Sequence, residues 1–80
     1  MIDPLSEVML ERAAQDAKWG VQDHPDLRWL AILTEEVGEL AQALIEGRAA
    51  DARRELTQVT AVGLAWLEAM ERARDAQRGG

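Results

Sequence analysis

Apolar residues recur every three or four positions along most of this chain, and two short segments around Gly20 and Gly47 interrupt the pattern. This period is that of an amphipathic α-helix, whereas no segment shows the alternation of apolar and polar residues that is typical of a strand. We therefore expect an all-α fold with three main helices, at about residues 4–18, 27–46 and 50 or 51 to 76. A chain of 80 residues has room for one domain, spanning residues 1–80.

Residues at the expected helix ends support these limits. Asp3 is a suitable N-cap, with Pro4 at the first helical position. Pro25 disfavours helical geometry before it, so Asp26 can cap the second helix, and Gly47 is the expected stop. Because the segment between the second and third helices is short, the third helix should fold back antiparallel on the second.

Each expected helix carries one apolar stripe that we expect to form the core. The stripes are Leu5, Val8, Met9, Ala13 and Ala17 in the first helix, Leu30, Leu33, Val37, Ala41 and Leu44 in the second, and Ala52, Val59, Val62, Trp66, Ala69 and Ala73 in the third. The second helix has a further apolar face, which combines acidic side chains with Trp29, Ile32, Leu40 and Ala43. This second face is unusual for a helix surface in contact with water.

The composition predicts self-association. Hydrophobic residues make up 48% of the chain, and no cysteine is present to form a stabilising disulfide. A domain of this size buries only about 60% of the surface that its unfolded chain exposes. We therefore expect the helical bundle to be completed by homo-oligomerisation.

The net charge of −6 limits the classes of partner. A nucleic-acid polymer or an anionic membrane surface would reward clustered lysine and arginine, so neither is expected. No run approaches the roughly 18 apolar residues of a membrane span. The first ten residues lack the basic-then-apolar order of a signal peptide, which favours a cytoplasmic protein.

The most informative polar residues form two pairs at i and i+3, Glu36 with Glu39 and Glu55 with Gln58. This spacing places both members of a pair on one helix face. Glu55 falls inside an apolar stripe, where a carboxylate is costly unless it is paired or bound to a metal. Antiparallel packing would bring the two pairs together, and converging carboxylates in helical bundles can hold divalent metals. Oxygen ligands alone favour Mg²⁺, with Mn²⁺ as a second possibility.

These acids also have a structural interpretation. Glu35 and Glu36 can be surface charges that pair with Arg28 or Lys18. Glu55 can form a buried ion pair with an arginine near the start of the third helix. The sequence leaves both interpretations open.

A family resemblance becomes visible at the same residues. EEVGE at 35–39 followed by ELTQ at 55–58, with KWGVQDHPD at 18–26 before them, resembles the MazG-like all-α nucleoside triphosphate pyrophosphohydrolases. The similarity extends over about Asp16 to Arg72. It implies a helical bundle completed as a homodimer or homotetramer. It also implies Mg²⁺-dependent hydrolysis of a nucleoside triphosphate to the monophosphate and pyrophosphate, which serves nucleotide-pool house-cleaning.

The resemblance also implies roles for individual residues. Glu36, Glu39 and Glu55 match family acids that bind the metal, and Glu35 matches the first acid of the EExxE pattern. Gln58 stands where the family has aspartate. Its amide oxygen can bind a metal, but it has no charge and cannot act as a base. Glu35 or Glu39, with a free oxygen, would orient the attacking water.

Three further residues are candidates for substrate contact. Lys18 can contact a phosphate, and Trp19 can stack on a base, although a surface lysine and a core tryptophan are equally good interpretations. Trp29 shares the acidic face of the second helix, which makes it the better candidate for a base contact.

Two alternative functions remain open. The chain can be a phosphoribosyl-ATP pyrophosphohydrolase, an enzyme of the same superfamily, although the KWG segment favours the MazG-like assignment. It can also be a helical binding or regulatory module that retained the fold and lost catalysis, as Gln58 would permit.

Overall fold

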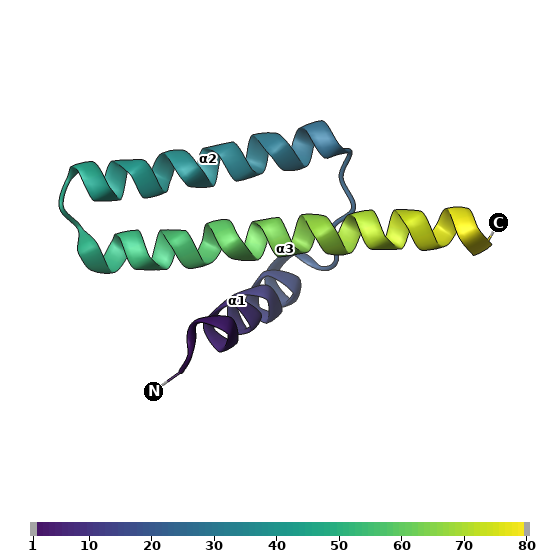
Figure 1. Ribbon diagram of the computed structural model, residues 1–80, viewed down its shortest axis with the longest axis horizontal. Helices are drawn as coiled ribbons and strands as arrows, with labels where there is room; N and C mark the ends of the chain where they lie inside the picture. The colour runs from purple at the N-terminus through teal and green to yellow at the C-terminus, as the bar shows by residue number, and fades with distance from the viewer. Residues whose placement is uncertain (1, 80) are drawn as a thin grey trace.

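The computed structural model describes residues 2–79, which form three helices: α1 (Pro4–Trp19), α2 (Asp26–Ile45) and α3 (Ala49–Gly79). No strand occurs in this part of the chain, so the prediction of an all-α fold is confirmed. Figure 1 shows α2 and α3 side by side as an antiparallel hairpin, with α1 crossing α3 on the other side. Within residues 2–79, no helix combines the length and the apolar character needed to span a membrane.

The expected boundary of the first helix is reproduced in detail. Asp3 accepts a hydrogen bond from the Ser6 backbone nitrogen at 2.8 Å, and Pro4 occupies the first turn. The helix ends at Gly20, whose φ of 73° is readily adopted only by a residue without a side chain. Gly47 has a φ of 72° and allows the chain to reverse between α2 and α3.

The expected cap of the second helix is wrong. Pro25 is the N-cap residue, Asp26 is already helical, and no side chain caps the first turn. The Asp26 carboxylate instead accepts a hydrogen bond from the indole nitrogen of Trp66 at 2.9 Å. This bond joins the start of α2 to the middle of α3, and the tertiary contact thus replaces the local cap.

The core between α2 and α3 uses a different face of α2 from the one expected. Its buried residues are Trp29, Val62, Ala65 and Ala69, with Ile32, Leu33 and Trp66 packed against them. Ala43 is also completely buried, and its small side chain allows α2 to lie close to α3. Leu30, Val37, Ala41 and Leu44, which the sequence places in the core, are exposed. The face shared by Trp29 and the acids is the one that contacts α3.

The stripe predicted on α3 is largely correct. Ala52, Val62 and Ala69 are buried, and Val59 and Trp66 are half-buried. Ala73 is exposed because the C-terminal end of α3 extends beyond the other two helices, as Figure 1 shows. An apolar residue there has no helix to pack against.

The stripe predicted on α1 is mostly wrong. Leu5, Met9, Ala13 and Ala17 are exposed, and Val8 is half-buried. The buried residue of this helix is Arg12, with 8% of its surface exposed. Helix α1 contacts α3 but forms no interface with α2. It docks through a charged side chain because α3 supplies a carboxylate, Glu68, at the contact.

Candidate functional site

Three carboxylates converge where the middle of α2 faces the first third of α3. Carboxylate oxygens of Glu36, Glu39 and Glu55 lie within 4.8 Å of one another. Glu36 and Glu39 are one helical turn apart on α2, and the antiparallel packing of α3 brings Glu55 beside them. Glu36 and Glu55 are half-buried, whereas Glu39 is exposed. The cluster therefore has a sheltered side and a side open to solvent.

Gln58 joins the cluster from α3. With its amide nitrogen turned toward the acids, Nε2 donates to Glu36 Oε2 at 3.1 Å and to Glu55 Oε2 at 3.3 Å. Rotation of the amide by half a turn exchanges nitrogen and oxygen, so the same side chain can present an acceptor to a cation. Gln58 can thus either bridge the two carboxylates or bind a metal between them.

The acids of the cluster have no basic partner. None of the ion pairs formed within residues 2–79 involves Glu35, Glu36, Glu39 or Glu55. The arginines at the start of α3 bind other acids: Arg53 pairs with Glu7, and Arg54 with Asp51. The interpretation of these acids as members of surface or buried ion pairs is therefore not supported.

The missing counter-charge affects the ionisation of Glu36. Burial raises the pKa of this carboxyl group to about 7, and the negative charges of Glu39, Glu55 and Glu35 and a hydrogen bond with Glu55 add to the shift. Like charges held this close disfavour full ionisation. A divalent cation would relieve the repulsion, and three carboxylates with an amide oxygen are ligands that suit Mg²⁺ or Mn²⁺.

A cavity of about 260 Å³ adjoins the acids and is enclosed by all three helices and the loop between α1 and α2. Glu36 and Gln58 form part of its wall, so the cluster and the cavity share two residues. Trp29, Ile32, Val62 and Ala65 supply apolar lining from the core. The side of the cavity formed by α2 and α3 therefore offers an apolar surface beside the carboxylates.

Of the residues that α1 and the following loop contribute to this cavity, the sequence prediction found Trp19 and missed the others. The missed residues are Glu11, Arg12, Gln15, Asp16, Gly20, Val21 and Gln22. It also missed Arg72, which lines the cavity from α3. Arg12, Gln15 and Asp16 follow i, i+3 and i+4 spacing on one helix face, which is a weak signal in the sequence. Without the fold, nothing distinguishes that face from an ordinary solvated one.

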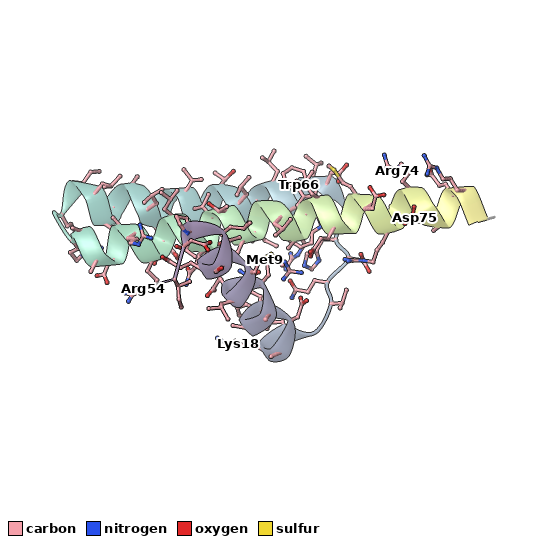
Figure 2. The ribbon with its side chains drawn as sticks, turned by 60° about the horizontal axis from the view of Figure 1, so that its bottom comes forward. Met9, Lys18, Arg54, Trp66, Arg74 and Asp75 are labelled. Carbon is pink, nitrogen blue, oxygen red and sulfur yellow. The ribbon has the colours of Figure 1, made fainter. Side chains whose placement is uncertain are left out.

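Of the three residues predicted to contact the substrate, two line the cavity and one does not. Trp29 lines the cavity and is only 3% exposed, and Trp19 lines it while remaining 57% exposed. Lys18 is not part of the cavity wall, and its ammonium group lies 4.6 Å from the ring centre of Trp19. Figure 2 shows Lys18 beside α1, away from the α2–α3 hairpin. Both tryptophans are thus placed beside the cavity, and Lys18 is not.

Glu35 occupies a peripheral position. It is exposed and does not belong to the three acids whose oxygens approach one another. Its charge still contributes to the raised pKa of Glu36. An exposed carboxylate near the cluster remains accessible to water.

Comparison with known proteins provides no relative: no protein-family model, no curated protein and no solved structure matches this chain. The function is therefore inferred from the geometry of the site and from the motif that carries it.

The raised pKa of Glu36 predicts an unusual dependence of stability on pH. The folded protein keeps the Glu36 proton up to about pH 7, whereas the unfolded chain releases it near 4.5. In a metal chelator, the free energy of unfolding should therefore fall as the pH rises from about 4.5 through 7. Glu36→Gln should remove this loss and be more stable than the natural sequence by about 1–3 kcal/mol at pH 8 but not at pH 4.

Urea denaturation at the two pH values measures this difference. Asp75→Asn, which changes an exposed acid near the C-terminal end of α3 (Figure 2), is the matched control and should show no such dependence. An advantage of Glu36→Gln that is equal at both pH values would contradict the assignment.

Proposed function

We propose that this protein is a metal-dependent nucleoside triphosphate pyrophosphohydrolase, which releases a nucleoside monophosphate and pyrophosphate. The observation that carries the proposal is the shared boundary between the carboxylate cluster and the cavity, formed by Glu36 and Gln58. Metal ligands beside a cavity with one apolar side fit a substrate with a polyanionic part and a flat organic part. The EEVGE and ELTQ motifs, which resemble those of MazG-like enzymes, supply the same four side chains.

Glu36, Glu39 and Glu55 would hold Mg²⁺ or Mn²⁺, with the amide oxygen of Gln58 as a further ligand. The bound cation supplies charge neutralisation for the phosphates and for the leaving pyrophosphate. The helices would partly shield the bound cation from water, because Glu36 and Glu55 are half-buried between α2 and α3. Exposed Glu39 faces the side from which the triphosphate would approach.

Water attack on the triphosphate requires an acceptor for the proton of the water. Glu35 and Glu39 are both exposed carboxylates on α2, and either one can orient the water and accept its proton. Water adds to phosphorus, the bond between the α and β phosphate groups breaks, and pyrophosphate leaves. We assign this role to Glu39 first, because it belongs to the converging cluster and Glu35 does not.

The cavity would receive the base and sugar. Trp29 and Trp19 lie on its wall and provide aromatic surface for a base. A nucleotide bound in this way extends from the apolar lining toward the acids. The reaction would serve the removal of surplus or non-canonical nucleotides in the cytoplasm.

Product analysis tests the proposed reaction. The purified protein is incubated with canonical and modified nucleoside triphosphates in Mg²⁺ and separately in Mn²⁺, and anion exchange separates the products. We expect monophosphate and pyrophosphate, and we expect Glu39→Gln to lower the rate by about 100-fold or more, because a metal ligand and a base are both removed. Asp75→Asn should retain the activity. Release of inorganic phosphate alone, or no turnover in either metal, would contradict the proposal.

A second candidate is a binding or regulatory module without catalysis. The observation that favours it is the position of Gln58: with its amide nitrogen turned toward the acids, it bridges Glu36 and Glu55 and can hold them together without a metal. An amide at this position also lacks the charge of the aspartate found in the related motif. The same fold would then bind a nucleotide without cleaving it.

Gln58→Asp distinguishes the two candidates. In a weakened enzyme, the added carboxylate should raise metal affinity and turnover by about tenfold or more, because cation sites gain affinity with ligand charge. Gln58→Asn, which is equally short but uncharged, is the matched control and should not activate. Failure of Gln58→Asp to turn over any triphosphate, combined with nucleotide binding by the natural sequence, would favour the module.

The proposed active form is a homo-oligomer, a dimer or a tetramer. No large side chain in the described residues is fully buried, and large apolar side chains are exposed on α2 and α3. They include Leu30, Val37 and Leu44 on α2 and Leu56, Leu67 and Met70 on α3. A second copy of the chain would cover these faces and supply the core that one copy lacks.

Sedimentation equilibrium tests the oligomeric state. We expect a mass at least twice the 8.9 kDa of one chain, and Val37→Asp should shift the protein toward the monomer because it places a charge in an apolar interface. Ala31→Asp, an exposed position of α2 outside both apolar faces, is the control and should leave the mass unchanged. A natural sequence that sediments as a monomer at all concentrations would contradict the proposal.

A further inference from the structure

Charged groups connect helix α1 to α3. Its large apolar residues Leu5, Met9 and Leu10 are exposed, and its buried residue is Arg12. Two ion pairs connect the helices, Arg12 with Glu68 and Arg53 with Glu7. The packing of α2 on α3 is apolar by comparison, through Trp29, Val62 and the alanines around them. One wall of the cavity is therefore held by apolar contacts and the other by ion pairs.

Arg12 uses all of its hydrogen-bonding capacity inside the protein. Its Nε donates to Glu68 Oε1 at 3.0 Å, and Nη2 donates to the same oxygen. Nη1 donates to Asp16 Oδ1 at 3.0 Å and to Gln15 Oε1 at 3.4 Å, and Nη2 reaches Asp16 Oδ2 at 3.3 Å. These five bonds match the five N–H groups of a guanidinium. Arg12 therefore has no donor left for a phosphate or another ligand.

Two of the three partners of Arg12 are themselves part of the cavity wall. Gln15 and Asp16 line it from α1, and Arg12 lies on the same wall. Glu68 belongs to α3 and is 56 positions away in the chain. Arg12 thus fixes the position of the α1 wall relative to α3. The loop between α1 and α2 is bound to α3 separately, because Arg72 donates hydrogen bonds to Asp23 and to the backbone oxygen of Gln22.

We propose that Arg12 is a positioning residue for the cavity: by bridging Glu68 on α3 to Gln15 and Asp16 on α1, it sets the width of the cavity and hence the affinity for the organic part of the ligand. The carboxylate cluster depends on the packing of α2 with α3, in which α1 takes no part. Loss of Arg12 should therefore weaken ligand binding and leave the chemistry at the acids intact. The kinetic part of this inference rests on the proposed pyrophosphohydrolase function.

The test compares four variants: Arg12→Met, Glu68→Met, the double variant, and Arg53→Met. Methionine replaces Glu68 because glutamine would keep the oxygen that accepts both bonds from Arg12. Arg53→Met removes an ion pair between the same two helices away from the cavity, where Arg53 is exposed and does not line the wall. For Arg12→Met and Glu68→Met, we expect KM to rise about tenfold and kcat to change less than about twofold. The double variant should be no worse than either single variant, because both remove one bridge. Arg53→Met should keep the KM of the natural sequence.

Amide hydrogen exchange provides a readout that does not depend on catalysis. Exchange at residues 12–22 should become faster in Arg12→Met and Glu68→Met and remain unchanged in Arg53→Met, while urea unfolding shows that the rest of the chain stays folded. A protein without pyrophosphohydrolase activity refutes the proposed function alone, and the inference about Arg12 is then judged by exchange. Three results would overturn the inference about Arg12. The first is that Arg53→Met has the same effect as Arg12→Met. The second is that Arg12→Met lowers kcat and kcat/KM equally, and the third is that the effects of the two single variants on KM add in the double variant.

Discussion

The packing of α2 against α3 through Trp29, Val62 and Ala65 is the contact on which the rest of the structure depends. It sets the antiparallel register that brings Glu55 of α3 to Glu36 and Glu39 of α2, the three acids of the cluster. It also forms the apolar side of the cavity. The candidate metal centre and the candidate ligand cavity are thus two consequences of one helix pair.

Charge is distributed unevenly around this pair. The acids of the cluster have no basic partner in the described chain, and the resulting repulsion together with burial raises the pKa of Glu36. Arg12, by contrast, is surrounded by carboxylate and amide oxygens that satisfy it completely. Unbalanced charge is unfavourable in a half-buried site unless a ligand compensates it. The acids around Glu36, which lack a basic partner, are therefore the stronger indication of a ligand than the cluster at Arg12, whose hydrogen bonds are satisfied within the chain.

A second feature of the structure is the apolar surface that one copy of the chain leaves exposed. A domain of this size has a small interior, and in the described residues the core consists largely of alanines with Trp29 and Val62. The exposed leucines and valine on α2 form a continuous stripe at helical spacing, which scattered surface residues do not. This stripe supports the proposed homo-oligomer, because a symmetric contact can use the same stripe on both copies.

The sequence by itself determined the features that depend on neighbouring residues. Helix identity, the cap at Asp3, the glycine stops at Gly20 and Gly47, and the pairing of Glu36 with Glu39 on one face all follow from local spacing. The tertiary structure decided which of the two apolar faces of α2 turns inward, because an isolated helix has no partner to distinguish them. It also decided that Arg12 is buried and that α1 closes the cavity. Arg12 is bonded there to Glu68, which lies 56 positions away and gives no signal in the sequence near Arg12.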